Sequence, residues 1–272
     1  TGTLDIAMDL DETDANRVAN GEVDDATLVE LAAENVYSIA FPEYTEVFSD
    51  IRVREALSYA LDVEAITEIA YGSLGEVANS CIPANLQYAL DVGVQEYDPE
   101  YAKELLAEAG YSDGDIELSL VIVGSDTNER MATAIQSYWQ AVGVTLNIES
   151  CDLATAISHF MASETDVVID QGSVVSLDPY EKLMMNLDNS TNATIRITDP
   201  DFNADLRAGV STSDEAERQA AYEAAQQWIH DNYRVIPICE IQVGCVYRPS
   251  KIAALNTLPD ECTTLRYVTF TG

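Results

Sequence analysis

The sequence predicts an α/β fold, and three features in the middle of the chain lead to this prediction. Asp98 and Pro99 place a capping side chain and a proline at the start of a helix that Gly110 ends. Residues 116–123 then form an apolar strand, and after a second helical pattern another strand begins at Val144. A strand, a helix and a strand within about thirty residues form a right-handed crossover, which places the two strands parallel and adjacent.

Composition and charge exclude several classes of protein. The 272 residues are 47% hydrophobic, enough to build the core of one or two domains, and no apolar run reaches the roughly 18 residues of a membrane span. The formal net charge is −35, from 48 acidic and 13 basic residues. Because such a field repels phosphate backbones, we expect no direct nucleic-acid partner.

The five cysteines indicate neither a metal site nor a disulfide framework. Their number is odd, and none has the close spacing of metal ligands. Cys239 and Cys245 would lie about 20 Å apart on one extended strand, too far to bond, and only a hairpin at residues 242–244 could bring them together. We therefore expect buried thiols and no bound metal.

The N-terminal 48 residues are predicted to contain two strands and one helix. The strands are expected at 4–8 and 36–41, and the helix at 26–33. The acidic stretch between the first strand and the helix is interpreted as a loop.

Aspartates mark the starts of most of the other helices, because a carboxylate can accept hydrogen bonds from the free N–H groups of a first turn. The predicted caps are Asp50, Asp62, Asp98, Asp152, Asp178 and Asp199. Thr212 and Glu215 have the spacing of a capping box ahead of a long helix. Residues 73–96 form a long polar connection, which should line a site or wrap a surface. Strands are predicted at 167–169 and 235–247.

Sequence motifs of the common enzyme classes are absent. The chain has no G-x-G-x-x-G, no Walker-type lysine loop and no G-x-S-x-G. Its two histidines, His159 and His230, lie within helical patterns without a partner three or four residues away. We therefore expect no catalysis and no cofactor.

Several segments resemble one family in collinear order over about residues 48–248. Two of them are sequence motifs: FSDIRVREAL at 48–57, which continues to Asp62, and YDPE at 97–100, which is followed by AKELLAEAGY at 102–111. The others are the strand–helix–strand unit that ends at Glu149, the segment 165–167, and the helix and strand at 222–237. These segments are similar to the family 5 extracellular solute-binding proteins, the peptide/nickel-type receptors of ABC importers.

The resemblance implies a second lobe of a two-lobed, periplasmic-binding-protein-like fold, plus an incomplete part of the first lobe. Residues 1–48 would belong to the first lobe, 49–237 would form the second lobe, and 238–272 would return to the first lobe. The missing part of the first lobe, and any export or lipid-anchoring signal, would then lie upstream of this sequence.

The implied function is that of the solute-binding component of an ABC importer, without catalysis. Such a receptor captures a small solute (peptide-like, a metal complex or a sugar) between its lobes and delivers it to the permease subunits. The implied location is the periplasm or cell surface, with membrane attachment only through an upstream lipid anchor. The alternative is an intracellular ligand-sensing domain of a transcription regulator with the same fold, and an α/β enzyme is disfavoured by the absent motifs.

One departure from the family pattern concerns the solute. In peptide-binding members, an aspartate in the loop after the 167–169 strand pairs with the peptide α-amino group, next to a tryptophan. Aligned on Asp178 and Pro179, these positions are Val175 and Gly172. Because an uncharged site cannot neutralise a buried ammonium, we do not expect peptides to bind in the usual way.

The predicted site lies at the carboxyl ends of two strands, where open α/β sheets bind their ligands. One strand ends ahead of Ser125 and Asn128, and the other ahead of a polar loop. The predicted ligand-binding residues are Ser125, Asn128, Gln171, Ser173, Val175 and Ser176. Ser125 and Asp126 could each cap the helix that follows, and we assign that role to Asp126.

Overall fold

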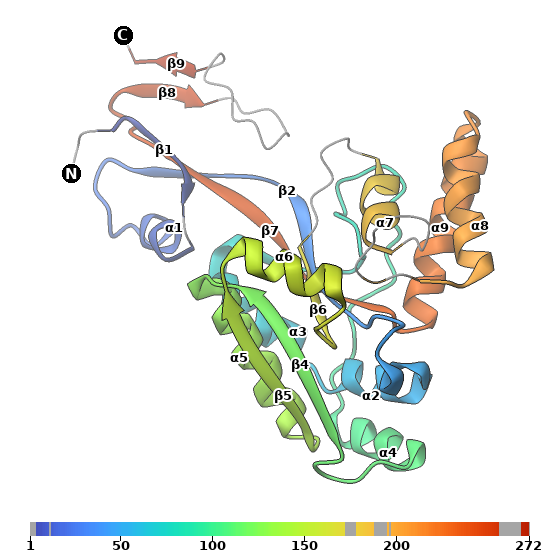
Figure 1. Cartoon of the computed structure of the whole chain (residues 1–272). Helices are drawn as coiled ribbons and strands as arrows, with labels where there is room; N and C mark the ends of the chain where they lie inside the picture. The colour runs from blue at the N-terminus through green and yellow to red at the C-terminus, as the bar shows by residue number, and fades with distance from the viewer. Residues whose placement is uncertain are drawn as a thin grey trace.

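The computed structural model is a mixed α/β structure and describes residues 4–10, 12–171, 178–187, 195, 197–255 and 268–271 (Figure 1). The strands are β1 (Ile6–Leu10), β2 (Thr27–Ala40), β3 (Gly75–Val77), β4 (Ile116–Val123), β5 (Val144–Cys151), β6 (Val168–Asp170), β7 (Val235–Tyr247), β8 (Ile252–Leu255) and β9 (Val268–Phe270). The α-helices are α1 (Glu12–Ala19), α2 (Ile51–Tyr59), α3 (Val63–Tyr71), α4 (Pro99–Ala109), α5 (Asp126–Gln140), α6 (Leu153–Ala162), α7 (Pro179–Leu187), α8 (Pro200–Ser211) and α9 (Glu215–Asp231).

The predicted crossover is confirmed. β4 and β5 are parallel, in register from Ile116 opposite Val144 to Val123 opposite Cys151, and α5 connects them. At the start of α4, the Asp98 carboxylate accepts a hydrogen bond from the backbone N–H of Tyr101 at 2.9 Å, and Pro99 is the first helical residue. The spacing of apolar residues and the end signals were sufficient here because the unit is local in sequence.

A long antiparallel pair, β2 with β7, joins the two ends of the chain. β7 also pairs with β1 and β3, and β2 pairs with β6, which gives the strand order β1-β7-β2-β6. The β6 segment reaches the parallel pair as well, through a parallel bridge between Leu120 and Val167. In Figure 1 the β2–β7 pair runs from the part of the molecule that holds both termini down to the helices of the larger part.

Two expectations for the N-terminal segment were wrong. Residues 26–33, predicted as a helix, form the first half of β2, where Thr27 pairs with Tyr247 and Leu31 with Val243. The predicted acidic loop contains helix α1, which buries Ala15. The helical propensity of the alanines in 26–33 is small per residue, and pairing with β7 outweighs it.

The capping prediction at Thr212 was also wrong, whereas the six predicted aspartate caps were right. The Asp214 carboxylate caps α9 by accepting hydrogen bonds from the N–H groups of Ala216 and Glu217. Thr212 instead donates its hydroxyl to the Glu217 carboxylate at 2.8 Å. The Asp178 carboxylate accepts a hydrogen bond from the N–H of Tyr180 in the first turn of α7.

Two buried arginines hold the connection between β2 and α2. Arg54 donates hydrogen bonds to the carbonyl oxygens of Phe48 at 2.6 Å and Asn232 at 2.8 Å. Arg234 donates to the carbonyls of Phe41 and Phe48, and its side chain lies 3.7 Å from the Glu43 carboxylate. Burial, with the neighbouring Arg234, lowers the pKa of Arg54 to about 10, so Arg54 is still charged at neutral pH. The segment 48–57 that resembles the family is thus a structural junction.

Two apolar clusters form the core. The larger packs α2–α5 against β4 and β5 and includes Trp139, whose indole N–H donates to the carbonyl of Leu57 at 2.9 Å. The smaller packs α7, α8 and α9 around Val168 and Phe202. On β2 the buried members of the clusters are Ile39 and Ala40, and on β7 they lie within 235–239. No described side chain at 27–29 or 245–247 belongs to either cluster.

The long connection at 73–96 wraps a surface. The buried amide of Gln226 on α9 accepts a hydrogen bond from the N–H of Leu90 and donates to the carbonyl of Tyr88. The Glu240 carboxylate on β7 accepts one from the N–H of Ala84 at 2.8 Å. No described helix is long and apolar enough to cross a membrane.

Cys239 and Cys245 lie on the single strand β7, and both are free thiols, as the spacing predicted.

The position of the two core clusters predicts uneven protection along the β2–β7 ladder. Amides at 27–29 and 245–247, where no described side chain belongs to either cluster, should exchange roughly tenfold or more faster than amides at 36–40, 235–236 and 238–239. Native-state hydrogen exchange resolved by mass spectrometry measures both halves of the same strands. Equal protection along the whole ladder would contradict this prediction.

Candidate functional site

The carboxyl ends of the parallel strands meet at one edge. The N–H of Gly124, just after β4, donates a hydrogen bond to the carbonyl of Cys151 at the end of β5, at 2.8 Å. Beyond Gly124, the Ser125 hydroxyl accepts a hydrogen bond from the N–H of Asn128 at 3.1 Å and so caps α5. The helix N-terminus therefore opens at the edge where the sequence placed the site.

The side chain of Asn128 joins the two predicted polar loops. It is buried, with 7% of its surface exposed, and its amide donates to the carbonyl of Val123 at 2.9 Å. Its oxygen accepts a hydrogen bond from the side-chain amide of Gln171, the residue after β6, at 3.0 Å. Ser125, Asn128 and Gln171 thus come together as a connected set, although they derive from two separate strand ends.

These contacts distinguish the parts the three residues can play. Asn128 uses its amide to fix the ends of β4 and β6, which is a positioning role. Gln171 is half-buried, and the bond to Asn128 engages one of its two amide N–H groups. Its geometry suits a hydrogen-bonding contact with a ligand. Ser173, Val175 and Ser176, the other predicted site residues, lie outside the described residues.

The assignment of the cap to Asp126 was wrong. Ser125 adopts the extended backbone of an N-cap residue, with φ −155° and ψ 154°, whereas Asp126 is the first residue of the helix. A residue already in helical conformation cannot direct its own side chain to the N–H groups two and three positions on in the way an N-cap does. Asp126 is exposed.

A buried ion pair that the sequence did not reveal lies behind this edge. The Lys182 ammonium on α7 donates a hydrogen bond to the carbonyl of Val36 at 2.7 Å and lies 3.5 Å from the carboxylate of Asp170. Both side chains are buried. The only sequence signals were a carboxylate directly after an apolar strand and one of just three lysines in the chain, and neither indicates a partner.

Two further titratable groups belong to this interior. Burial raises the pKa of the Cys81 thiol to about 12, so the thiol is neutral, despite the opposing effect of Lys182. Burial also raises the pKa of Glu240 above its ordinary value, and the hydrogen bond from Ala84 and the nearby Lys182 only partly offset this.

Asp178, at the start of α7, is also paired. Its carboxylate accepts a hydrogen bond from the Tyr222 hydroxyl at 2.9 Å and forms an ion pair with Arg218 on α9. The Arg218 guanidinium lies over the rings of Tyr88 and Tyr222, at 5.8 and 5.6 Å from their centroids. The acids that flank residues 171–177 on either side, Asp170 and Asp178, therefore each face a cation.

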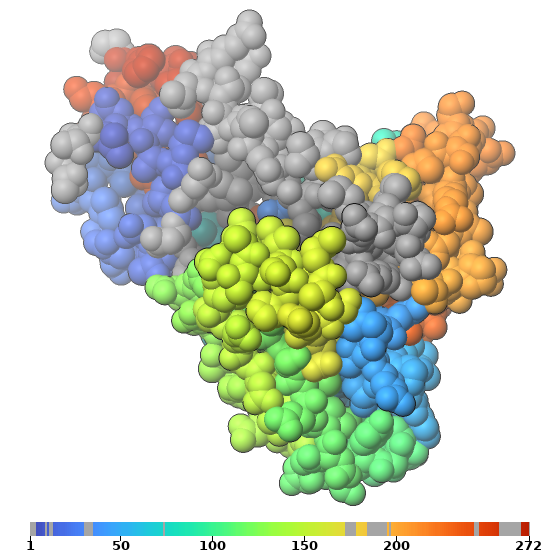
Figure 2. Space-filling model, in the orientation of Figure 1, coloured from blue at the N-terminus to red at the C-terminus, as the bar shows by residue number. Residues whose placement is uncertain are grey.

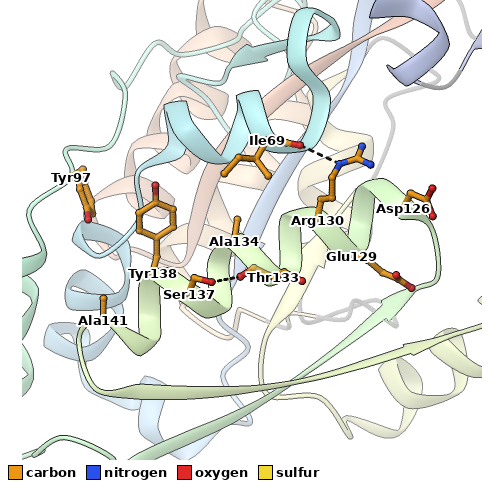
Figure 3. Close-up of a pocket in the computed structure, with 10 residues that line it drawn as sticks. All are labelled: Ile69, Tyr97, Asp126, Glu129, Arg130, Thr133, Ala134, Ser137, Tyr138 and Ala141. Carbon is orange, nitrogen blue, oxygen red and sulfur yellow. Dashed lines mark hydrogen bonds between the residues drawn. The ribbon is translucent and has the colours of Figure 1, made fainter.

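A groove on the described surface lies elsewhere. It has a volume of about 820 Å³, runs between α3 and α5, and is lined in part by Ile69, Tyr97 and Tyr138 (Figure 3). Its cation, Arg130, donates hydrogen bonds to the carbonyls of Ile69 and Ala70 at the end of α3. The groove contains none of Ser125, Asn128 and Gln171, so it is separate from the candidate site predicted at the strand ends.

Within the described ranges, no three His, Cys, Asp or Glu side chains are arranged to hold a metal ion.

A family model decides the relationship. The model described as "Bacterial extracellular solute-binding proteins, family 5 Middle" matches residues 1–194. The chain belongs to this family. The resemblance noted in the sequence is therefore confirmed.

Curated relatives of the chain are binding proteins of greater length. Heme-binding protein A of Haemophilus influenzae is 33% identical over 221 residues, which cover 78% of this chain and 40% of the relative. Di/tripeptide-binding protein 2 of Pseudomonas aeruginosa is 30% identical over 222 residues, 78% of this chain and 41% of the relative. The chain thus spans about two fifths of the length of these relatives.

Solved structures confirm the fold. NikA from Brucella suis, in complex with Fe(III)-EDTA, superposes with a TM-score of 0.86 at 18% identity, over 99% of this chain and 58% of that one. A dipeptide-binding protein from Pseudoalteromonas, in complex with Met-Leu, gives a TM-score of 0.83 at 22% identity, over 99% of this chain and 54% of that one. The fold is that of periplasmic binding proteins, of which this chain represents about half.

The helix cap gives a prediction with a built-in control. Ser125→Ala should lower the free energy of unfolding by about 1 kcal/mol, because the N–H of Asn128 loses its acceptor. Asp126→Ala should cost less, since an exposed charge in a first turn contributes only a few tenths to about 1 kcal/mol. Urea denaturation of the two variants measures both. A larger loss for Asp126→Ala would restore the cap to that residue.

Burial of Glu240 predicts a pH dependence. The pKa of Glu240 is raised in the folded state, so the unfolded chain loses this proton first as the pH rises through the ordinary value of 4.5. The contribution of Glu240 to the free energy of unfolding therefore falls as the pH rises above that value. The amide of Glu240→Gln has no such proton to lose. The melting temperature of the variant, relative to that of the parent protein, should therefore be higher at pH 7 than at pH 4. Glu104→Gln, exposed on α4, is the control. A difference that stays constant with pH would contradict the prediction.

Proposed function

We propose that this chain is part of the solute-binding component of an ABC importer. The full-length protein would capture a small solute between two lobes and deliver it to the permease subunits, without catalysis. Membership of family 5 carries this proposal. The junction of Ser125, Asn128 and Gln171 supports it locally, because it presents hydrogen-bonding groups and a helix N-terminus at the strand ends.

The charges around the site bear on the class of solute. Named relatives bind heme or di- and tripeptides, so the family alone leaves the solute open. By the resemblance described above, aligned on Asp178 and Pro179, Val175 of this chain stands where peptide-binding members carry an aspartate. The flanking acids Asp170 and Asp178 are paired with Lys182 and Arg218, so neither is a ready substitute for that aspartate. We therefore favour a solute without a buried ammonium, such as a metal complex or a sugar.

The proposed location follows from the same role. Relatives include a protein named as a periplasmic oligopeptide-binding protein. A receptor that hands solutes to an importer must work outside the cytoplasm, in the periplasm or at the cell surface. For the full-length protein we propose attachment to the membrane through a lipid anchor. No observation favours the alternative of a transcription regulator; a DNA-binding domain upstream of this segment would support it.

The function is tested with the full-length gene product. Its melting temperature is measured with sugars, with nickel and iron chelates, and with dipeptides in free and N-acetylated forms. The proposal expects a stabilising solute among the first two classes, because a ligand that binds only the folded state raises the melting temperature. Stabilisation by free dipeptides that N-acetylation abolishes would show that an ammonium is bound. The receptor function would be contradicted if none of these compounds stabilised the protein and if deletion of the gene left the cellular uptake of all of them unchanged.

The 272-residue chain should bind the solute weakly. A solute site between two lobes buries most of the ligand's surface, and a chain that forms only one side of the cleft cannot do so. Calorimetry with the solute identified above should give an affinity at least on the order of tenfold lower for the chain than for the full-length receptor. Equal affinities would place the whole site within this chain.

Gln171 is the described residue that we expect to contact the solute. In the full-length receptor, Gln171→Ala should weaken binding by about 1 kcal/mol or more, because a hydrogen bond to the solute is lost, with little change in melting temperature. Gln140→Ala, an exposed glutamine on α5, is the matched control and should change neither. Unchanged affinity in Gln171→Ala, together with loss of binding after substitutions in residues 73–96, would assign the site to that connection.

A further inference from the structure

Helix α6 exposes a stripe of large apolar side chains. Leu153, Ile157 and Met161 recur every four residues on one face, and they are 60%, 50% and 53% exposed. Figure 2 shows the helix as a yellow-green ridge on the face turned to the viewer. Single exposed apolar residues are ordinary on protein surfaces, but three on one helix face form a patch of the kind that marks an interaction site.

The helix also lacks the charge that covers the rest of the chain. Its ten residues include no Asp, Glu, Lys or Arg, in a protein with 48 acidic residues. The exposed positions beside the stripe are Ala154, Ser158 and Ala162. A solvated helix in so acidic a protein would be expected to carry carboxylates. Their absence indicates a surface selected for contact with another apolar surface.

The position of α6 connects the stripe to the candidate site. The helix begins at Leu153, directly after the end of β5, whose Cys151 carbonyl is bonded to Gly124. In Figure 1, α6 lies beside the upper ends of β4 and β5, and α1 lies to its left. The helix that carries the stripe therefore begins at the edge that holds Ser125 and Gln171.

The size of the stripe argues against a stable dimer. Three side chains provide far less than the roughly 800 Å² that each partner buries in a standard interface. A contact of this size is suited to a partner that covalent connection already holds nearby, because the entropy of association is then largely avoided. The chain covers 40% of Heme-binding protein A and 58% of the NikA structure, so family members carry a further portion that could supply such a surface.

We propose that the α6 stripe is the contact surface for the portion of the full-length receptor that this chain does not include, which would cover it with an apolar, uncharged surface. This inference rests on the proposed function, since that function requires a second lobe. The contact joins the two lobes at the rim of the solute site.

Oxidation of methionine tests the contact without a ligand. Dilute hydrogen peroxide is applied to the 272-residue chain and to the full-length protein, and conversion of Met161 to the sulfoxide is followed by mass spectrometry. We expect Met161 to react at least on the order of tenfold more slowly in the full-length protein. Met131, which is fully buried, is the internal control and should resist oxidation in both. Equal reactivity of Met161 in the two proteins would overturn the proposal.

A pair of substitutions provides an independent measurement. Ile157→Glu should lower the melting temperature of the full-length protein and leave that of the 272-residue chain unchanged. Ser158→Glu adds the same charge beside the stripe and should leave both unchanged. Equal effects of Ile157→Glu on the two proteins would contradict the contact, as would a dimer of the 272-residue chain that this substitution dissociates. Failure here with a solute still bound would leave the receptor function intact.

Discussion

The antiparallel pairing of β2 with β7 is the constraint on which the rest of the structure depends. It joins the start of the chain to its last third, carries β1 and β3 on one strand and β6 on the other, and links the part that holds the termini to both apolar clusters. Arg54 and Arg234 bond the carbonyls of the segment that follows β2. These guanidiniums satisfy backbone groups that would otherwise be buried without partners, so the ladder and α2 are held in one arrangement.

The candidate site depends on one side-chain amide, that of Asn128. Asn128 bonds the carbonyl at the end of β4 and the amide of Gln171 after β6, and Ser125 caps its backbone N–H. A local feature, the start of α5, and a long-range one, the approach of two strand ends, therefore share one residue. The neutral character of this junction and the paired state of Asp170 and Asp178 are what lead us to a solute without a buried ammonium.

Much of this could be predicted from the sequence, because many of the signals are local. Aspartate caps and the change from helical to strand periodicity located most elements of the central part of the chain. The rule that open α/β sheets bind ligands at the carboxyl ends of their strands predicted that Ser125 and Gln171 lie at the same edge. The failures involve information that a local pattern does not hold. Residues 26–33 have helical composition but pair with β7. The Asp170–Lys182 pair depends on how α7 packs on β2, which no spacing reveals. The cap was misplaced by one residue because a hydroxyl and a carboxylate stand side by side at positions 125 and 126, and only backbone conformation distinguishes them.

The most direct test of the account is a crystal structure of the full-length receptor with its solute bound. The account predicts a neutral polar group of the solute within hydrogen-bonding distance of the Gln171 side chain, at the ends of β4 and β6. A solute seated in the groove between α3 and α5, or an ammonium group paired with Asp170 or Asp178, would contradict it.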